Sequence, residues 1–308
     1  MKTVDVIIPV YKPDKKLLLL LDRLEHQSVP VNKIILINTE QKYFDRLVYG
    51  TSFYDTYRNI SVIHISKKEF DHGNTRNKAV KASAADIFVM MTQDAIPADE
   101  YLIEKLTKPL EEEQTAVSYA RQLPAEDCGE AERYTRQFNY PEQSRLKTKE
   151  DLGELGIKTY FCSNVCAAYN REIFKDLGGF VKRTIFNEDM IFAAKAVDMG
   201  YHISYMAEAQ VIHSHNYTCT QQFHRNFDLG VSQAEHPEVF AGLRSEGEGI
   251  SLIKKTTAYL WKTKNRKKIP ILYINSFCKY AGFFLGKHFR VLPRFMILKC
   301  SMSKAYWK

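Results

Sequence analysis

An acidic side chain stands where a buried strand should end in the stretch DIFVMMTQDA at 86–95. Asp94 follows an apolar run of strand character, so its carboxylate would emerge at the edge of a sheet. Such a carboxylate could hold Mg²⁺ or Mn²⁺ against a substrate diphosphate, because hard oxygen ligands and phosphates commonly complete these sites. The plainer alternative is an aspartate that shapes the turn before Pro97, and the position by itself favours that alternative.

Two histidines in QVIHSHNYT at 210–218 offer further nitrogen ligands. Val211, His213 and His215 alternate, so their side chains would share one face if this segment is a strand. Either histidine could equally be structural. Cys219 follows them, but no second cysteine stands at a spacing that suits zinc.

Adjacent acids occur in FNEDM at 186–190. On a helix the side chains of Glu188 and Asp189 point about 100° apart, so only one of them can face a substrate. A carboxylate at a helix N-terminus is kept ionised by the helix dipole, which suits a general base. The alternative is that both acids only stabilise the start of the helix.

Apolar runs in the first hundred residues predict the strands that would position these groups. The runs are 4–10, 33–38, 59–65 and 86–91. They are continuous in apolar character, as is typical of strands covered on both faces. Helices between them, including one over about 74–84, predict an α/β fold with a parallel, doubly wound sheet. Ligands bind beyond the carboxyl ends of such strands. The polar residues expected there are Tyr11, Glu40, Gln93 and Asp94.

The second half of the chain is less regular. Residues 123–157 are polar and charged, which indicates an insertion or a loop region. The segment 159–169 returns to strand character. An amphipathic helix is then expected over 187–200, with Asn187 as its N-cap and Gly200 as its terminator.

Positive charge is concentrated at the C-terminal end. The net charge is +8, but residues 251–308 contain 14 Lys and Arg and no acid. The residues before them hold the other 30 basic side chains against all 36 acidic ones, a net charge of −6. The body of the protein therefore lacks the charge of a nucleic-acid binder, and we expect no nucleic acid as a partner.

Four short motifs, taken in order, resemble family 2 glycosyltransferases of GT-A fold. They are IIPVYK at 7–12, FDHGNTRN at 70–77, MTQDA at 91–95 and FNEDM at 186–190. Their order and spacing agree with the family from about residue 4 to residue 230. The form FDHGNTRN in particular is similar to the bacterial rhamnosyltransferase branch, which uses dTDP-L-rhamnose.

The resemblance implies a binding site for a nucleotide-sugar donor. Its residues would be Pro9, Val10, Tyr11, Glu40, Asp71, His72, Arg76, Asn77, Gln93 and Asp94. The turn at Tyr11 and the region of Glu40 would flank the base and ribose. Arg76 would bind the diphosphate or the edge of the base through the directed donors of its guanidinium. Of Asp71 and His72, at least one would orient the donor or a loop.

The resemblance also implies a metal and a catalytic base. Gln93-Asp94-Ala95 departs from the commoner Asp-x-Asp pattern and leaves one carboxylate for Mg²⁺ or Mn²⁺. A histidine late in the fold would add a ligand, and we favour His215 over His213. The Glu-Asp motif would supply the base, with Asp189 in that role and Glu188 supporting it.

These roles predict an inverting, metal-dependent transferase. It would move L-rhamnose from dTDP-L-rhamnose to a polyprenyl-diphosphate-linked saccharide for a bacterial cell-surface polysaccharide. Asp189 would deprotonate the acceptor hydroxyl, which attacks as the diphosphate leaves. The alternatives are a transferase that uses another nucleotide hexose, or a catalytically silent protein that only binds nucleotide sugars.

The basic end predicts contact with a membrane. We divide the chain into a catalytic domain at 1–230, with a donor half at about 1–120 and an acceptor half at about 121–230, and a helical region at 231–308. Residues 251–308 are too often interrupted by charge to span a bilayer, but they suit an anionic membrane surface. The expected insertion residues are Trp261, Tyr273, Phe277, Phe283 and Phe284. The alternative is helices that pack on the catalytic domain. The N-terminus does not resemble a secretory signal, so we expect a cytoplasmic protein attached to the inner face of the cell membrane.

Overall fold

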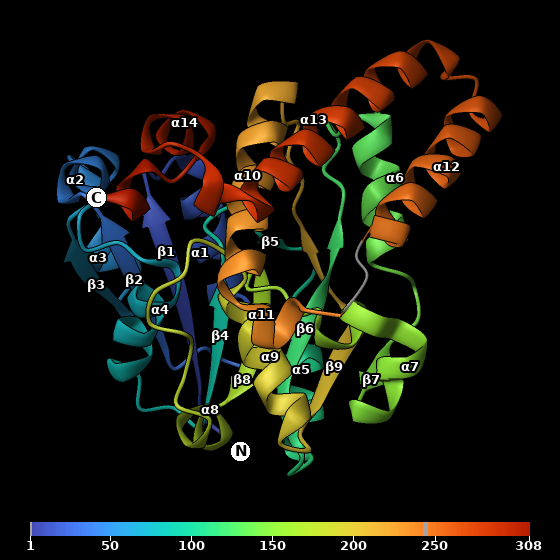
Figure 1. The fold of residues 1–308 in the computed structure, drawn as a ribbon. Helices are drawn as coiled ribbons and strands as arrows, with labels where there is room; N and C mark the ends of the chain where they lie inside the picture. The colour runs from blue at the N-terminus through green and yellow to red at the C-terminus, as the bar shows by residue number, and fades with distance from the viewer. Residues whose placement is uncertain (1, 243–245) are drawn as a thin grey trace.

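One mixed sheet forms the centre of the computed structural model, which describes residues 2–242 and 246–308 (Figure 1). Its strands are β1 (Val4–Tyr11), β2 (Lys33–Thr39), β3 (Ile60–Ile65), β4 (Ile87–Met91), β5 (Ile96–Pro97), β6 (Thr115–Leu123), β7 (Arg145–Lys147), β8 (Cys166–Asn170) and β9 (His202–Ile212). They are ordered β3-β2-β1-β4-β8-β6-β9-β5, and β7 pairs with β9.

The four strands expected in the first part of the chain are all present and parallel to one another. Alternating side chains of β1 enter different cores, since Ile7 packs on one side of the sheet and Ile8 on the other. The predicted α/β sheet is therefore confirmed. Parallel pairing brings the carboxyl ends of β1, β2 and β4 to one edge, which is where ligands bind in such sheets.

The second half of the sheet is mixed. β8 is antiparallel to both β4 and β6, whereas β6 and β9 are parallel. The strand expected over 159–169 begins only at Cys166, because residues 156–160 form a 3₁₀ helix and the backbone of Asn164 binds the side chain of Asp189.

Helices cover both faces of the sheet. They are α1 (Lys15–Glu25), α2 (Gln41–Val48), α3 (Phe53–Thr56), α4 (His72–Lys81), α5 (Leu102–Thr107), α6 (Glu130–Asn139), α7 (Leu152–Leu155), α8 (Arg171–Asp176), α9 (Glu188–Asp198), α10 (Cys219–Glu235), α11 (Pro237–Phe240), α12 (Glu246–Lys262), α13 (Ile269–Lys287) and α14 (Arg294–Cys300). Buried leucines of α1 and α5 join one core, and α4, α8 and α9 contribute to the other.

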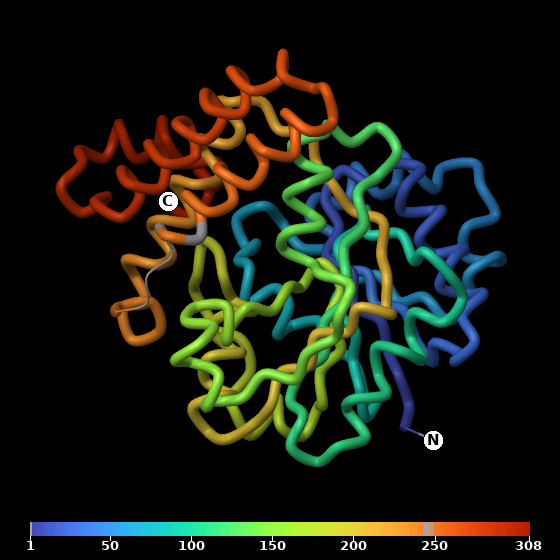
Figure 2. Tube along the Cα trace, turned by 90° about the vertical axis from the view of Figure 1, so that its right-hand side faces the viewer, coloured from blue at the N-terminus to red at the C-terminus, as the bar shows by residue number. Residues whose placement is uncertain are grey.

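The C-terminal helices lie together at one end of the molecule, opposite the N-terminus (Figures 1 and 2). α13 crosses α10 at very short range, because both helices carry glycine at the crossing. A Cβ on Gly282 would lie 2.2 Å from the Phe223 carbonyl oxygen, and one on Gly286 would lie 2.1 Å from that of Phe227. The predicted boundary at residue 230 falls inside α10.

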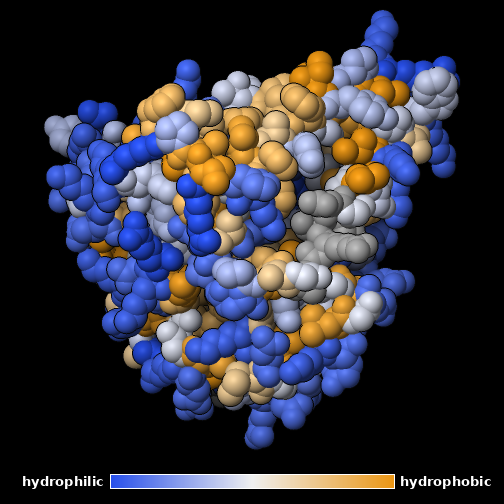
Figure 3. Space-filling model, in the orientation of Figure 1, coloured by the Kyte–Doolittle hydropathy of each residue, from blue (hydrophilic) through white to orange (hydrophobic). Residues whose placement is uncertain are grey.

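No helix within residues 2–242 and 246–308 is both long enough and apolar enough to cross a membrane. Apolar side chains nevertheless gather on the surface where Figure 1 places α10, α13 and α14 (Figure 3). Those of α13 that stand most exposed are Ile271, Tyr273, Ile274, Phe277, Tyr280 and Phe284.

Candidate active site

A cavity of about 460 Å³ opens beyond the end of β4 and is lined by both halves of the sheet. Asp94 and Asp189, which come from distant motifs, both line it. His72, Arg76, Glu188, His213 and His215 line it as well. Three of the four motifs, those at 70–77, 91–95 and 186–190, therefore share one cavity.

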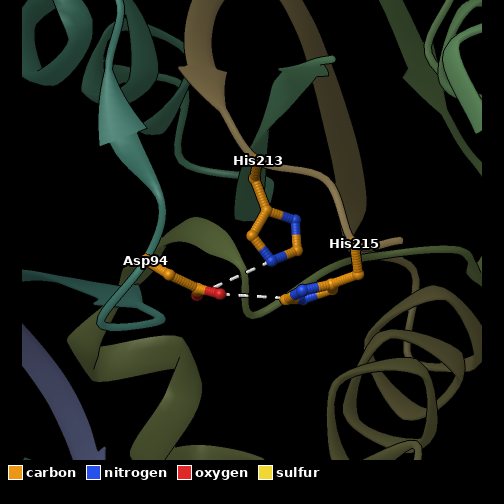
Figure 4. Close-up of side chains that lie close together, drawn as sticks. All are labelled: Asp94, His213 and His215. Atoms are coloured by element: carbon orange, nitrogen blue, oxygen red, sulfur yellow. Dashed lines mark ion pairs between the residues drawn. The ribbon is translucent and has the colours of Figure 1, made fainter. Parts of the chain in front are cut away.

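Asp94, His213 and His215 form a compact group of metal-type ligands (Figure 4). His213 Nε2 lies 3.6 Å from Asp94 Oδ1, and His215 Nε2 lies 3.7 Å from Asp94 Oδ2. The predicted strand geometry of the histidines is wrong, since β9 ends at Ile212 and both residues lie in the following loop. Both still reach Asp94, although we had favoured His215 alone.

Hydrogen bonds fix which nitrogen of His213 faces Asp94. Arg136 donates to Gln122 Oε1, and Gln122 Nε2 donates to Tyr140 and Ser163, so the orientation of the amide is determined. Gln122 Oε1 can then only accept from His213 Nδ1–H, at 3.0 Å. Burial lowers the pKa of His213 to about 3, so the ring is neutral and Nε2 presents a lone pair.

That lone pair faces the carboxylate of Asp94, and a cation between these two acceptors would bind both of them. A histidine that donates its other N–H to a carbonyl oxygen is the usual arrangement around a bound metal. Burial also lowers the pKa of His215, which favours its neutral, ligating form. Asp94, His213 and His215 therefore fit a divalent cation, with one oxygen and two nitrogen ligands.

Glu188 and Asp189 have different surroundings. Glu188 is 4% exposed, and its Oε1 lies 3.2 Å from Arg76 Nε and accepts from Asn164 Nδ2 at 3.0 Å. Arg76 Nε has no hydrogen bond, so its contact with Glu188 is an ion pair of imperfect direction. Burial alone would raise the pKa of Glu188, but the charge of Arg76, together with His72 and the hydrogen bond from Asn164, holds this pKa below its usual value. The carboxylate of Glu188 is therefore ionised and paired with Arg76.

Asp189 is less buried than Glu188, and no cation among the described residues forms an ion pair with it. Its Oδ2 accepts from Asn164 N and its Oδ1 from Met190 N, both at 2.9 Å. Burial and the neighbouring charge of Glu188 raise the pKa of Asp189 to about 7. A carboxyl with a pKa near neutrality can take up and release a proton, which suits a general base. The geometry favours Asp189 over Glu188 for that role.

A strained residue holds the two acids in place. Asn187 has left-handed backbone angles, φ 64° and ψ 21°, which asparagine tolerates better than most residues. It was predicted as the N-cap of α9, but its side chain makes no capping hydrogen bond. Asn187 Nδ2 instead donates to Ser232 Oγ at 3.2 Å, which ties the start of α9 to α10.

The motif FDHGNTRN binds the loop that leads to these acids. Asp71 caps α4 through Gly73 N and Asn74 N, and its second oxygen accepts from Thr184 N at 3.1 Å. Asn77 exchanges two hydrogen bonds with the main chain of Phe180. Gly73 is required because a Cβ there would lie 1.8 Å from the Val181 carbonyl oxygen. Asp71 and Asn77 therefore do not line the cavity but position its wall.

The remaining predicted donor residues lie beside the cavity, at the ends of β1 and β2. Gln93 clamps the main chain of Tyr11 with two hydrogen bonds, of 2.9 and 3.1 Å. Tyr11 is 39% exposed and meets the ring of Tyr43 edge-on. Glu40 accepts from Lys67 N at 2.7 Å. The last predicted pair, Pro9 and Val10, lies within β1, and Val10 is buried.

Several cavity residues were not predicted from the sequence. Gln222, Arg225 and Asn226 project from α10, Lys279 from α13 and Arg136 from α6. The spacing i, i+3, i+4 of the three α10 residues is a signal that could have identified one polar helix face. Lys279 could not be distinguished from the other basic residues near it, because its role depends on how α13 packs.

The arrangement can therefore do two things at once. A cation held by Asp94, His213 and His215 would attract phosphate oxygens to one wall of the cavity. A carboxyl able to accept a proton at neutral pH stands on another wall, at Asp189. Together they suit the displacement of a phosphorylated leaving group by a hydroxyl.

Comparison with known proteins agrees with this chemistry. The family described as glycosyl transferase family 2 matches residues 5–178. The chain is 40% identical to the O-antigen chain rhamnosyltransferase RfbN of Salmonella typhimurium, over 99% of this chain and 96% of the relative. It is 41% identical to the O-antigen chain rhamnosyltransferase WbaN of Salmonella anatum, over 85% of each.

Two solved structures share the fold. One is the mannosyltransferase PcManGT from Pyrobaculum calidifontis in complex with GDP-Man and Mn²⁺, with a TM-score of 0.57, 14% identity, and coverage of 99% of this chain and 85% of that one. The other is S. aureus TarS 1–349 in complex with UDP-GlcNAc, with a TM-score of 0.54, 16% identity, and coverage of 94% and 91%. Likeness at this identity shows the fold, and it confirms the predicted GT-A arrangement.

Proposed function

The chain belongs to glycosyl transferase family 2, and from this premise we propose that it transfers L-rhamnose from dTDP-L-rhamnose to a lipid-linked saccharide. The acceptor would be a polyprenyl-diphosphate-linked precursor of a cell-surface polysaccharide. One observation carries the choice of sugar: 40% identity extends over nearly the full length of both this chain and an O-antigen chain rhamnosyltransferase. The shared cavity of Asp94 and Asp189 supports the reaction type.

In the proposed reaction, Asp94, His213 and His215 hold Mg²⁺ or Mn²⁺. The cation, when bound, offsets the negative charge that builds on the departing nucleoside diphosphate. Asp189 accepts the proton of the acceptor hydroxyl, whose oxygen forms the new bond to the anomeric carbon. The bond from that carbon to the diphosphate oxygen breaks on the opposite face, so the anomeric configuration inverts.

The other predicted site residues support this step without a proton transfer. Arg76 keeps Glu188 ionised and fixed beneath the cavity. Asp71 and Asn77 fix the loop that carries both acids. The exposed ring of Tyr11 offers a surface for the base of the nucleotide.

The proposed acceptor reaches the site from a membrane surface bound by α13. Tyr273, Phe277, Tyr280 and Phe284 recur every three or four residues, so they form one exposed face of this helix, here called the aromatic stripe. Each of its rings is between 48% and 69% exposed. Residues 251–308 carry 14 basic and no acidic side chains, which complements anionic lipid. Phe283, also predicted to insert, does not belong to this stripe: it is half-buried, at the crossing with α10.

A panel of nucleotide sugars tests the proposed donor. The purified protein is incubated with Mn²⁺ and thymidine, uridine or guanosine donors, and both the unfolding temperature and the release of nucleotide are measured. We expect dTDP-L-rhamnose to give the largest stabilisation and a slow release of dTDP without acceptor. A response confined to another nucleotide would reassign the donor. Binding without any release, together with no transfer to a lipid-linked acceptor, would favour the silent binding protein.

Flotation with liposomes tests the membrane surface. Phe277→Ser with Phe284→Ser should reduce recovery with anionic vesicles, whereas Leu19→Ser, at an exposed site on α1, should not. Point variants are preferred to a truncation at residue 251, because removing α13 would also uncover α10. Equal recovery of all variants with anionic lipid would contradict the proposal.

A further inference from the structure

Most of the charged side chains that line the cavity have an identified partner. The cations are Arg76, Arg136, Arg225 and Lys279, and the anions are Asp94, Glu132, Glu188 and Asp189. Arg76 pairs with Glu188, and Arg136 pairs with Glu132 at 2.7 Å. Asp94 faces the two histidines, and Asp189 is held by backbone N–H groups. Two cations are left over.

Arg225 and Lys279 have no carboxylate partner among residues 2–242 and 246–308. The guanidinium of Arg225 lies over the ring of Phe186, 4.5 Å from its centre, which leaves its N–H groups directed elsewhere. Within the described chain it makes no ion pair or hydrogen bond, and the same holds for Lys279 Nζ. Charged groups removed from water are normally paired with an opposite charge. Two cations without such a partner in a cavity therefore indicate that a ligand supplies the anion.

The packing of α10 and α13 brings these two side chains to the same wall. Gly282 and Gly286 let α13 approach the backbone of α10, and Lys279 lies on this side of the helix, roughly opposite the aromatic stripe at 100° per residue. Burial lowers the pKa of Lys279, and this effect exceeds the opposite effect of the charge of Glu132, which is itself paired with Arg136. The position of Lys279 is therefore built into the fold and is not that of a freely moving surface lysine.

We propose that Arg225 and Lys279 together bind a diphosphate in the cavity, an inference that rests on the proposed transfer from a nucleotide sugar to a lipid diphosphate. Arg76 was predicted for this task, but its charge is already offset by Glu188. A guanidinium and an ammonium on neighbouring helices supply several charge-assisted N–H donors, which match the oxygens of a diphosphate. The diphosphate can come from the donor or from the acceptor lipid, and the two sources can be separated.

The first arm of the test measures the donor side. Isothermal titration with excess Mn²⁺ gives the affinity of the full-length protein for dTDP, UDP and GDP, with thymidine as a ligand that lacks phosphate. If the donor supplies the diphosphate, Arg225→Gln with Lys279→Gln should weaken binding of the preferred nucleoside diphosphate roughly ten- to hundredfold and leave thymidine unchanged. The second arm measures KM for the lipid-diphosphate acceptor and for a neutral glycoside of the same saccharide. If the acceptor supplies it, only the first KM should rise.

Matched variants separate binding from folding. Lys279→Arg keeps the charge and should retain most of the affinity. Arg23→Gln and Lys81→Gln remove exposed cations of α1 and α4 and should change neither arm. Values within twofold of wild type for the double variant in both arms would overturn the inference. The nucleotide arm needs no rhamnose transfer, so a wrong donor sugar would not be mistaken for a failed phosphate site.

Discussion

Arg76 and Glu188 form a buried ion pair beneath the cavity, with Nε 3.2 Å from Oε1 and both side chains less than 10% exposed. It joins α4 of the first half of the chain to the start of α9 in the second half. The FDHGNTRN motif and the FNEDM motif are therefore two sides of one structural contact. Asp189 owes its position to this contact, since it follows Glu188 directly.

Removing one member of this ion pair should destabilise the folded protein. In Arg76→Met the Glu188 carboxylate stays buried without its counter-charge, so we expect a loss of roughly 3–5 kcal/mol in the free energy of unfolding. The double variant Arg76→Met with Glu188→Gln should recover much of this loss. Lys78→Gln removes an exposed lysine from the same helix and should change stability by less than about 0.5 kcal/mol. Urea denaturation measures all three, and a double variant as unstable as Arg76→Met would contradict the pairing.

The rate of transfer should depend on the ionisation of Asp189. Its pKa is raised to about 7, and a base acts only when it has lost its proton. We therefore expect kcat/KM to fall as the pH is lowered through about 7. Asp189→Asn should lower kcat by roughly 10²–10⁴-fold, with nucleotide affinity nearly unchanged and without this pH limb in the residual rate. A variant that keeps the wild-type profile would reassign the base.

Metal affinity should depend on a residue that does not touch the metal. Gln122 orients His213 through Nδ1, so Gln122→Met should weaken Mn²⁺ binding roughly 10–100-fold, and His213→Ala should weaken it at least as much. His26→Gln, at the exposed residue that follows α1, is the control. Titration of Mn²⁺ followed by electron paramagnetic resonance measures free and bound metal. Wild-type affinity in both cavity variants would place the metal elsewhere.

Local patterns predicted most of the first half of the fold. The runs that form β1, β2 and β4 are apolar almost throughout, and burial on both faces of a central strand requires that composition. The helix geometry of Glu188 and Asp189 predicted that only one acid could face a substrate, whereas both line the cavity and differ in their partners. Which of them is buried depends on Arg76, and no local pattern shows where that guanidinium lies.

Tertiary contacts decided what the sequence could not show. His213 and His215 were paired by their alternation, yet they reach Asp94 from a loop because β9 ends before them. Lys279 was grouped with a basic surface, and only the crossing of α10 and α13 turns it toward the cavity. The strand expected at 159–169 begins only at Cys166 because of another tertiary contact: the backbone N–H of Asn164 donates to Asp189.

The crossing of α10 and α13 should tolerate no side chain at its glycines. In Gly282→Ala the new Cβ would lie 2.2 Å from a backbone oxygen of α10, which cannot move aside as a flexible side chain would. We expect a loss of roughly 1–3 kcal/mol in unfolding free energy, together with reduced transfer because Lys279 shifts with α13. Gly249→Ala in α12 adds the same methyl group in open space and should be neutral or stabilising by up to roughly 1 kcal/mol. Thermal unfolding of both variants tests this, and equal stability would show that α13 does not pack as closely as the structure has it.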